Sequence, residues 1–124
     1  MSKFIISPVA TGIKFDLRAA NGEAIAASEV YDTRAACLRG IASVRKCAAA
    51  GKILDLTEPG GHVTNPKFEV YQDKRCSYRF RLKARNGEVI AASEAYTTKA
   101  ACLGGVMSVI KNAPEAEIED LQRE

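Results

Sequence analysis

Thiols are the residues of this chain with the most obvious chemical potential. The four cysteines are Cys37, Cys47, Cys76 and Cys102, and the only histidine is His62. A thiol becomes a nucleophile when a nearby base or cation favours its thiolate, and structural zinc needs four nitrogen or sulfur ligands, usually in closely spaced pairs. The cysteines form no C-x-x-C pair, and the chain has only one histidine that could act as a further ligand or as a base. We therefore expect free, buried thiols, an exposed Cys76, and neither a metal nor another cofactor.

Two Ser-Glu pairs form a second chemical pattern. Ser28-Glu29 and Ser93-Glu94 each stand three residues before a tyrosine, counted from the serine. A Ser-Glu pair alone lacks the third group that orients a base toward a nucleophile. We expect these residues to make turn and cap hydrogen bonds. An enzyme that uses a thiol or this pair remains an alternative, which requires an acid, a base or a metal beside the reacting group.

Alternating basic residues form the pattern that most suggests a binding surface. Between Tyr78 and Arg85 every second residue is basic and the others are apolar or small, which is typical of a strand with one buried and one exposed face. The candidate binding residues are Arg79, Arg81, Lys83 and Arg85, with Lys14 and Arg18 from an equivalent strand and Tyr71 from a neighbouring one. Basic side chains beside an aromatic ring on a sheet can hold phosphates and stack a base.

Internal repetition explains why these patterns occur twice. Residues 21–46 and 86–111 align without a gap and are identical at 18 of 26 positions. We predict a first repeat over residues 1–57, a linker over 58–66 and a second repeat over 67–124. About 60 residues bury little surface alone, so the two repeats should share one sheet and one core and form a compact unit with pseudo-twofold symmetry.

The sequence pattern of each repeat predicts three strands, one helix and a fourth strand. Two alternating runs are followed by Asn-Gly, a signature of the type I′ turn in which both residues have positive φ. The third strands, 23–28 and 88–93, should direct Ile25 and Ala27, or Ile90 and Ala92, into the core. That orientation leaves the small residues Ala24, Ala26, Ala91 and Ser93 around the basic side chains. Helices follow, with Asp32 or Thr33 and Thr97 or Thr98 as N-caps, and the fourth strands cover 53–56 and 118–121. A glycine inside each helix, Gly40 and Gly105, indicates close approach to the sheet.

A longer motif resembles a known family. The pattern N-G-E-x-I-x-x-S-E-x-Y-x-[ST]-[KR]-A-x-C-L-x-G-[IV]-x-S-V-x-K occurs twice. In the second copy it is preceded by F-x-[IV]-Y and Y-R-F-R-L-K-A. Together these motifs resemble the YegP-like family, whose members carry one or two copies of a domain of unknown function. The resemblance implies an α+β fold of two tandem β(3)-α-β repeats. They would form one mainly antiparallel sheet, with both helices on one face and the C-terminal strands exchanged between repeats. It brings no activity or site residue.

Charge and hydropathy limit the function classes. The net charge is +3 and the sequence pI is about 8.7, below the value near 9 that is typical of nucleic-acid-binding domains. No run of about 18 apolar residues indicates a membrane span, and we expect a cytoplasmic location. The pattern favours a small, non-enzymatic binding or interaction module whose partner is a protein or a nucleic acid. The alternative is binding of single-stranded nucleic acid or another anion through the basic face. We expect a monomer with an internal pseudo-dimer, with a homodimer as the alternative.

Overall fold

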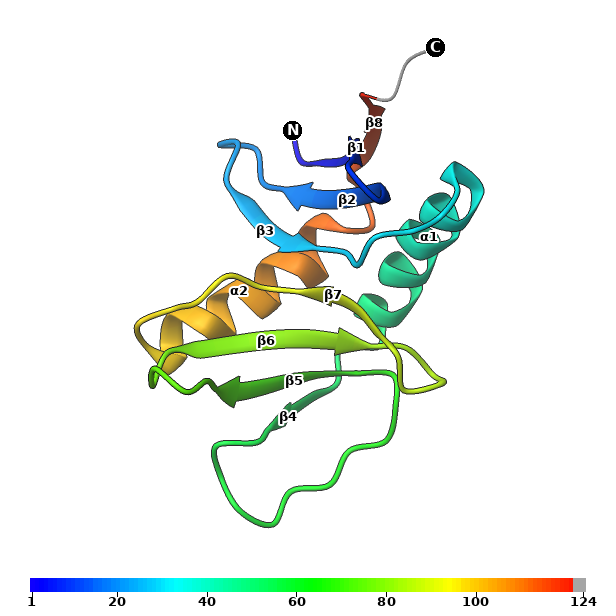
Figure 1. The fold of residues 1–124 in the computed structure, drawn as a ribbon. Coiled ribbons are helices and arrows are strands. Elements are labelled where there is room, and N and C mark those ends of the chain that lie inside the picture. Colours follow the sequence, from blue (N-terminus) through cyan, green and yellow to red (C-terminus); the bar gives the residue numbers. More distant parts are fainter. Residues whose placement is uncertain (122–124) are drawn as a thin grey trace.

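The secondary structure follows the predicted repeat. The computed structural model describes residues 1–121. The first repeat contains β1 (Lys3–Val9), β2 (Gly12–Arg18), β3 (Ala24–Ala27), α1 (Arg34–Ala49) and β4 (Ile53–Asp55) (Figure 1). The second contains β5 (Lys67–Gln72), β6 (Tyr78–Lys83), β7 (Val89–Ala92), α2 (Lys99–Asn112) and β8 (Glu117–Asp120). The expected β(3)-α-β order is therefore confirmed in both halves.

One eight-stranded sheet joins the repeats. Its order is β4-β5-β6-β7-β3-β2-β1-β8, so each edge strand pairs with the other repeat. The two outer pairs, β4 with β5 and β1 with β8, are parallel, and the remaining pairs are antiparallel. The first residue of each helix is bound to an exchanged edge strand: Lys99 Nζ lies 2.9 Å from Asp55 Oδ2, and Arg34 pairs with Asp120. The predicted exchange is confirmed, and it takes place within this chain.

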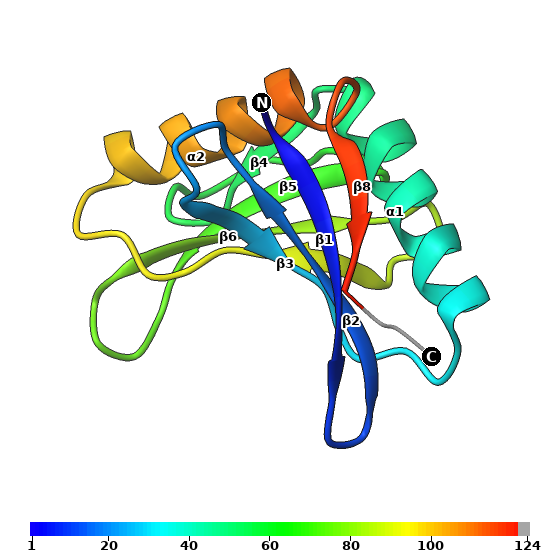
Figure 2. The ribbon, with the colours of Figure 1, turned by 90° about the horizontal axis from the view of Figure 1, so that it is seen from above.

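Both helices lie on the same side of the sheet (Figure 2). α1 packs against β2 of its own repeat and β5, β6 and β7 of the other, and α2 packs against β3, β5 and β6. The four phenylalanines at the centre, Phe4, Phe15, Phe68 and Phe80, are almost fully buried. Burial of such a side chain contributes roughly 1.5–3 kcal/mol, and these rings come equally from the two halves. The repeats therefore stabilise one common core.

The helix starts and the helical glycines have clear local causes. Thr33 and Thr98 are the N-caps, and each hydroxyl accepts a hydrogen bond from a first-turn amide, at 3.1 Å and 3.0 Å. A Cβ on Gly40 or Gly105 would collide with the ring of Tyr31 or Tyr96. The predicted close approach is therefore correct, and the tyrosine of the same repeat causes it.

The turn before the third strand differs from the type I′ prediction. Gly22 and Gly87 have φ values of 88°, but the asparagines before them do not have positive φ, since Cys76 is the one non-glycine residue with positive φ in the described part of the chain. Asn21 Oδ1 instead accepts a hydrogen bond from the amide of Glu23 at 3.0 Å, and Gly22 N–H donates to Ala19 O. The loop is therefore longer than a two-residue hairpin.

An irregularity in the third strand reverses part of the predicted orientation. Leu17 pairs with Ala26 and Asp16 with Ala27, and the register shifts before the next pair. The inserted residue moves Ala26 to the core side with Leu17 and Ala27 to the open side with Asp16. The second repeat has the same shift, which places Ala91 inside and Ala92 outside. The prediction is right for Ile25 and Ile90, which are buried, and wrong for these four alanines.

No helix among residues 1–121 has both the length and the hydrophobicity needed to cross a bilayer.

Candidate functional site

The Ser-Glu motifs complete the sheet rather than assemble a reactive group. Ser93 Oγ accepts a hydrogen bond from the Phe80 amide at 2.9 Å and donates to Glu94 O at 2.8 Å. Ser28 makes the same two bonds in the first repeat. Each hydroxyl thus accepts the hydrogen bond that a strand carbonyl would otherwise accept, and its own proton is donated to a backbone oxygen. The prediction that these residues make turn and cap hydrogen bonds is consistent with this arrangement.

Three of the four thiols lie inside the molecule. Cys37, Cys47 and Cys102 are buried and Cys76 is exposed, so the predicted distribution is confirmed. Burial raises the pKa of Cys102 to about 11, with a further contribution from the charge of Asp55, and burial also raises the pKa of Cys37. At neutral pH these two thiols are protonated, and they act as small apolar core residues.

Two cations on the open face of the first repeat share one carboxylate. Lys14 Nζ lies 3.0 Å from one oxygen of Asp16, and Arg18 approaches its other oxygen at 3.6 Å. Asp16 stands between them on the same face of β2 and is largely buried. These three side chains therefore leave a local surplus of one positive charge.

In the second repeat a buried carboxylate gathers three cations. Glu69 on β5 has a side chain only 6% exposed, and it lies 2.7 Å from Arg81, 3.4 Å from Lys83 and 3.5 Å from Lys67. Burial opposes its charged form, but hydrogen bonds and the charges of Arg81 and Lys83 outweigh this and lower the pKa of Glu69. One anion thus fixes three cations and leaves a local surplus of two positive charges.

An aromatic platform adjoins this cluster. The Arg81 guanidinium lies over the Tyr71 ring, with Cζ 4.5 Å from the ring centroid. Arg81 Nε also donates a hydrogen bond to Glu69 Oε1 at 2.7 Å. The Arg81 guanidinium is therefore held both by the Glu69 carboxylate and by the cation–π contact with the Tyr71 ring.

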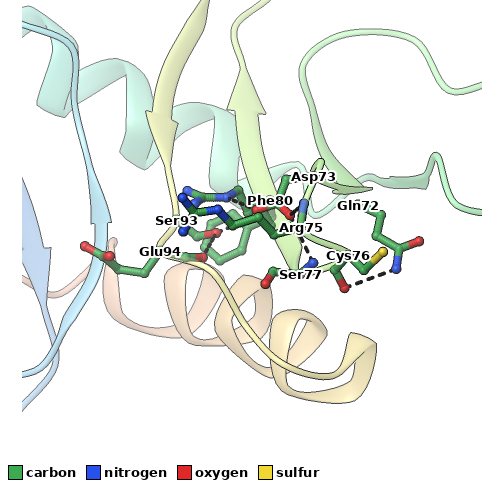
Figure 3. Close-up of polar contacts among 9 residues, drawn as sticks. Gln72, Asp73, Arg75, Cys76, Ser77, Phe80, Ser93 and Glu94 are labelled. Atoms are coloured by element: carbon green, nitrogen blue, oxygen red, sulfur yellow. Dashed lines mark hydrogen bonds and ion pairs between the residues drawn. The ribbon is translucent and has the colours of Figure 1, made fainter.

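The β5–β6 turn adds further cations. Asp73 Oδ1 accepts hydrogen bonds from the amides of Arg75 and Ser77, and its other oxygen accepts one from Arg79 Nε at 2.8 Å (Figure 3). The hydrogen bond from Arg79 and those from the turn amides lower the pKa of Asp73. A hollow of about 390 Å³ at this turn is lined by Tyr71, Asp73, Lys74, Arg75 and Arg79. We call the set Lys67, Tyr71, Lys74, Arg75, Arg79, Arg81 and Lys83 the β5–β6 basic face.

Arg85 does not belong to this face. β6 ends at Lys83, and Arg85 lies in the following turn, where it lines a hollow of about 310 Å³ with Ser43, Lys46 and Cys47 of α1. The prediction assumed that the alternation of β6 continues to Arg85. The turn and the irregularity between Leu82 and Lys83 end that alternation.

A larger hollow lies where the two repeats meet. Its volume is about 440 Å³, and alanines of β3 and β7 form part of its lining. It is bordered by three cations, Lys14, Arg18 and Arg79, and by three carboxylates, Asp16, Glu29 and Glu94. The Glu94 carboxylate points away from the β5–β6 turn toward the strands of the first repeat (Figure 3). The border charges balance, so this hollow offers no net attraction to an anion.

Sequence reasoning identified most of these side chains but not their partners. Of the seven predicted residues, Tyr71, Arg79, Arg81 and Lys83 come together in the second repeat, and Lys14 and Arg18 lie apart beside Asp16. Lys67, Lys74 and Arg75 were missed, although two of them stand together in the turn. Glu69 and Tyr71 are two residues apart on the same strand, so their side chains face the same side of the sheet. This spacing could have indicated that a carboxylate lies among the cations.

Fold and site together define a class of protein: an α+β chain of two β(3)-α-β repeats that complete one sheet and leave one face free of helices. The chain belongs to the family described as Domain of unknown function (DUF1508), whose model matches residues 10–55 and 73–120. The YegP-like resemblance read from the motif is confirmed by relatives of that name.

Three similar proteins contain one or two copies of this repeat. A UPF0339 protein of Mannheimia succiniciproducens is 40% identical over 109 residues, which are 88% of this chain and 84% of that protein. A UPF0339 protein of Treponema denticola is 60% identical over 55 residues, 44% of this chain but 95% of that protein, so it has the length of one repeat. The solution structure of YegP from E. coli has a TM-score of 0.82 at 27% identity and covers 99% of this chain and 95% of its own. It is described as a protein of unknown function.

Proposed function

We propose that this protein is a small, non-enzymatic binding module that uses the β5–β6 basic face to hold an anionic ligand. The observation that carries the proposal is the charge of that hairpin. Residues 67–83 contain six Lys or Arg against two Asp or Glu, a net charge of +4, on a face that neither helix covers. The equivalent hairpin, residues 3–18, contains three against one, a net charge of +2.

The ion pairs support the same assignment. In the first repeat Lys3 is paired with Glu119 at 2.7 Å, and Lys14 and Arg18 share Asp16. Every cation of that hairpin therefore has a carboxylate partner. In the second repeat three cations share Glu69. Lys74 and Arg75 lie in the β5–β6 turn that follows Asp73 and line the hollow there. The second repeat thus has the stronger positive potential, and a rigid sheet loses little freedom on binding.

A non-enzymatic role is supported by the fate of the candidate reactive groups. The repeated thiols are buried and protonated, and the repeated serine hydroxyls are bonded to the backbone. Within residues 1–121, no three His, Cys, Asp or Glu side chains cluster as metal ligands would. A rigid charged face requires none of these groups to react.

The test compares Arg79 with Lys14, the basic residue at the equivalent position of the first repeat. Binding of inorganic polyphosphate is followed by amide chemical shifts at low and high salt, for the wild type, Arg79→Ala and Lys14→Ala. We expect salt-sensitive shifts centred on β5 and β6, lost in Arg79→Ala and retained in Lys14→Ala. Equal losses in both variants, or shifts confined to the helices, would contradict the assignment of this face.

A further inference from the structure

The shape of the basic face narrows the anion that fits it. Arg79, Arg81 and Lys83 project from the same side of β6, at every second residue. Side chains at this spacing are about 6.6–6.8 Å apart along a strand. Lys67 lies across from Lys83, and the turn cations Lys74 and Arg75 extend the row at the other end. Such a row suits a linear chain of anions better than a single phosphate.

The centre of the row holds a cation–π pair, Tyr71 and Arg81. Tyr71 is opposite Arg79 on the neighbouring strand, and the Arg81 guanidinium covers its ring. The Arg81 side chain remains 31% exposed, so the pair presents a surface to solvent. An acidic peptide or an inorganic polyanion gains nothing from this platform, whereas an unpaired base can stack on an aromatic ring or on a guanidinium plane.

We propose that the ligand of the β5–β6 basic face is a single-stranded nucleic acid, with phosphates along Arg79, Arg81 and Lys83 and one base stacked on the Tyr71–Arg81 pair. This inference rests on the proposed function. A duplex keeps its bases stacked inside, so only a single strand can use the platform. Glu69 is a positioning residue, because it holds Arg81 in place from below the surface.

The carboxylates at the junction of the repeats limit the path of the strand. Glu29 and Glu94 border the central hollow and help to balance its cations, so the hollow does not attract phosphates. The first repeat has Ser7 where the second has Tyr71, and Asp16 where the second has Arg81. The strand therefore lies over one repeat only, and a chain carrying two repeats has one site.

The experiment uses the full chain and two probes of similar charge. One is a fluorescent oligouridylate of about twelve nucleotides, within the range of known single-strand sites. The other is inorganic polyphosphate, which has no bases. The variants are Tyr71→Ala, Tyr71→Phe and Arg79→Ala, with Lys14→Ala as the matched control, and circular dichroism confirms that each is folded.

The expected results separate this inference from the proposed function. Tyr71→Ala should weaken oligouridylate binding roughly 5- to 150-fold, as loss of one stacked base does, but leave polyphosphate binding unchanged. Tyr71→Phe should keep the affinity. The slope of log affinity against log salt should be about −2, the value for three phosphates of a single strand.

Other outcomes overturn one claim or both. Equal binding of the two probes, with no effect of Tyr71→Ala, would remove the nucleic acid and leave the anion-binding face. No salt-dependent binding of either probe would remove both. A measurement on the wild type alone also decides the stacking, since the ring protons of Tyr71 must shift on addition of oligouridylate and not on addition of polyphosphate.

Discussion

Two neighbouring glycines of α2 should respond in opposite ways to the same substitution. Gly104 is exposed and a Cβ there would meet nothing within 4 Å, whereas a Cβ on Gly105 would lie 2.9 Å from Phe80 Cε2 and 2.9 Å from Tyr96 Cζ. Alanine in place of glycine inside a helix contributes about 1 kcal/mol to stability through helix propensity. Gly104→Ala should obtain this gain in full.

At Gly105 the steric cost exceeds the gain. Phe80 is fully buried in the core, and Tyr96 is bonded to Tyr78 through both backbone groups, so neither ring can move aside easily. Overpacking of this kind costs about 1–3 kcal/mol. Gly105→Ala should therefore lose up to about 2 kcal/mol relative to the wild type, and the two variants should differ by about 1–3 kcal/mol.

Urea unfolding followed by circular dichroism measures both changes, and an unchanged slope would show that only the native state is affected. Adding Tyr96→Phe to Gly105→Ala should restore part of the loss, because it removes the hydroxyl that lies closest to the new methyl group. If both alanine variants are stabilised equally, the tyrosine is free to move. The glycine then does not mark a close approach of helix and ring.

Two further results follow from the buried charged and thiol groups. Glu69→Gln should lower stability at pH 7 by about 1–3 kcal/mol, because its cations lose their common carboxylate. The pKa of Glu69 is lowered by folding, so its contribution is complete above about pH 4.3 and is lost as the pH falls through the native pKa. The urea midpoints of the variant and the wild type should therefore converge as the pH falls below that native pKa. A thiol reagent at neutral pH should modify Cys76 in the native protein but modify Cys102 only after unfolding; mass spectrometry of the labelled chain checks this, and rapid native labelling of Cys102 would disprove its burial.

The sequence by itself determined the repeat and its secondary structure. Period-two alternation and helical spacing depend on neighbouring residues, and so do the threonine caps before α1 and α2. The burial of the helical cysteines could also be predicted from the sequence. A small apolar side chain on the core-facing side of a helix is buried wherever that helix packs. The exchange of β4 and β8 came from the family resemblance.

Tertiary structure decided which charges are free. Glu69 and its three cations come from two strands, and the pairing register that joins them is not a local property. One inserted residue in β3 and in β7 moved the alanines of those strands between faces, and the end of β6 removed Arg85 from the row. The strength of a charged surface depends on distances between residues far apart in the chain. For that reason the sequence identified a basic stripe, and only the fold showed that its cations keep a surplus of one positive charge around Asp16 and of two around Glu69.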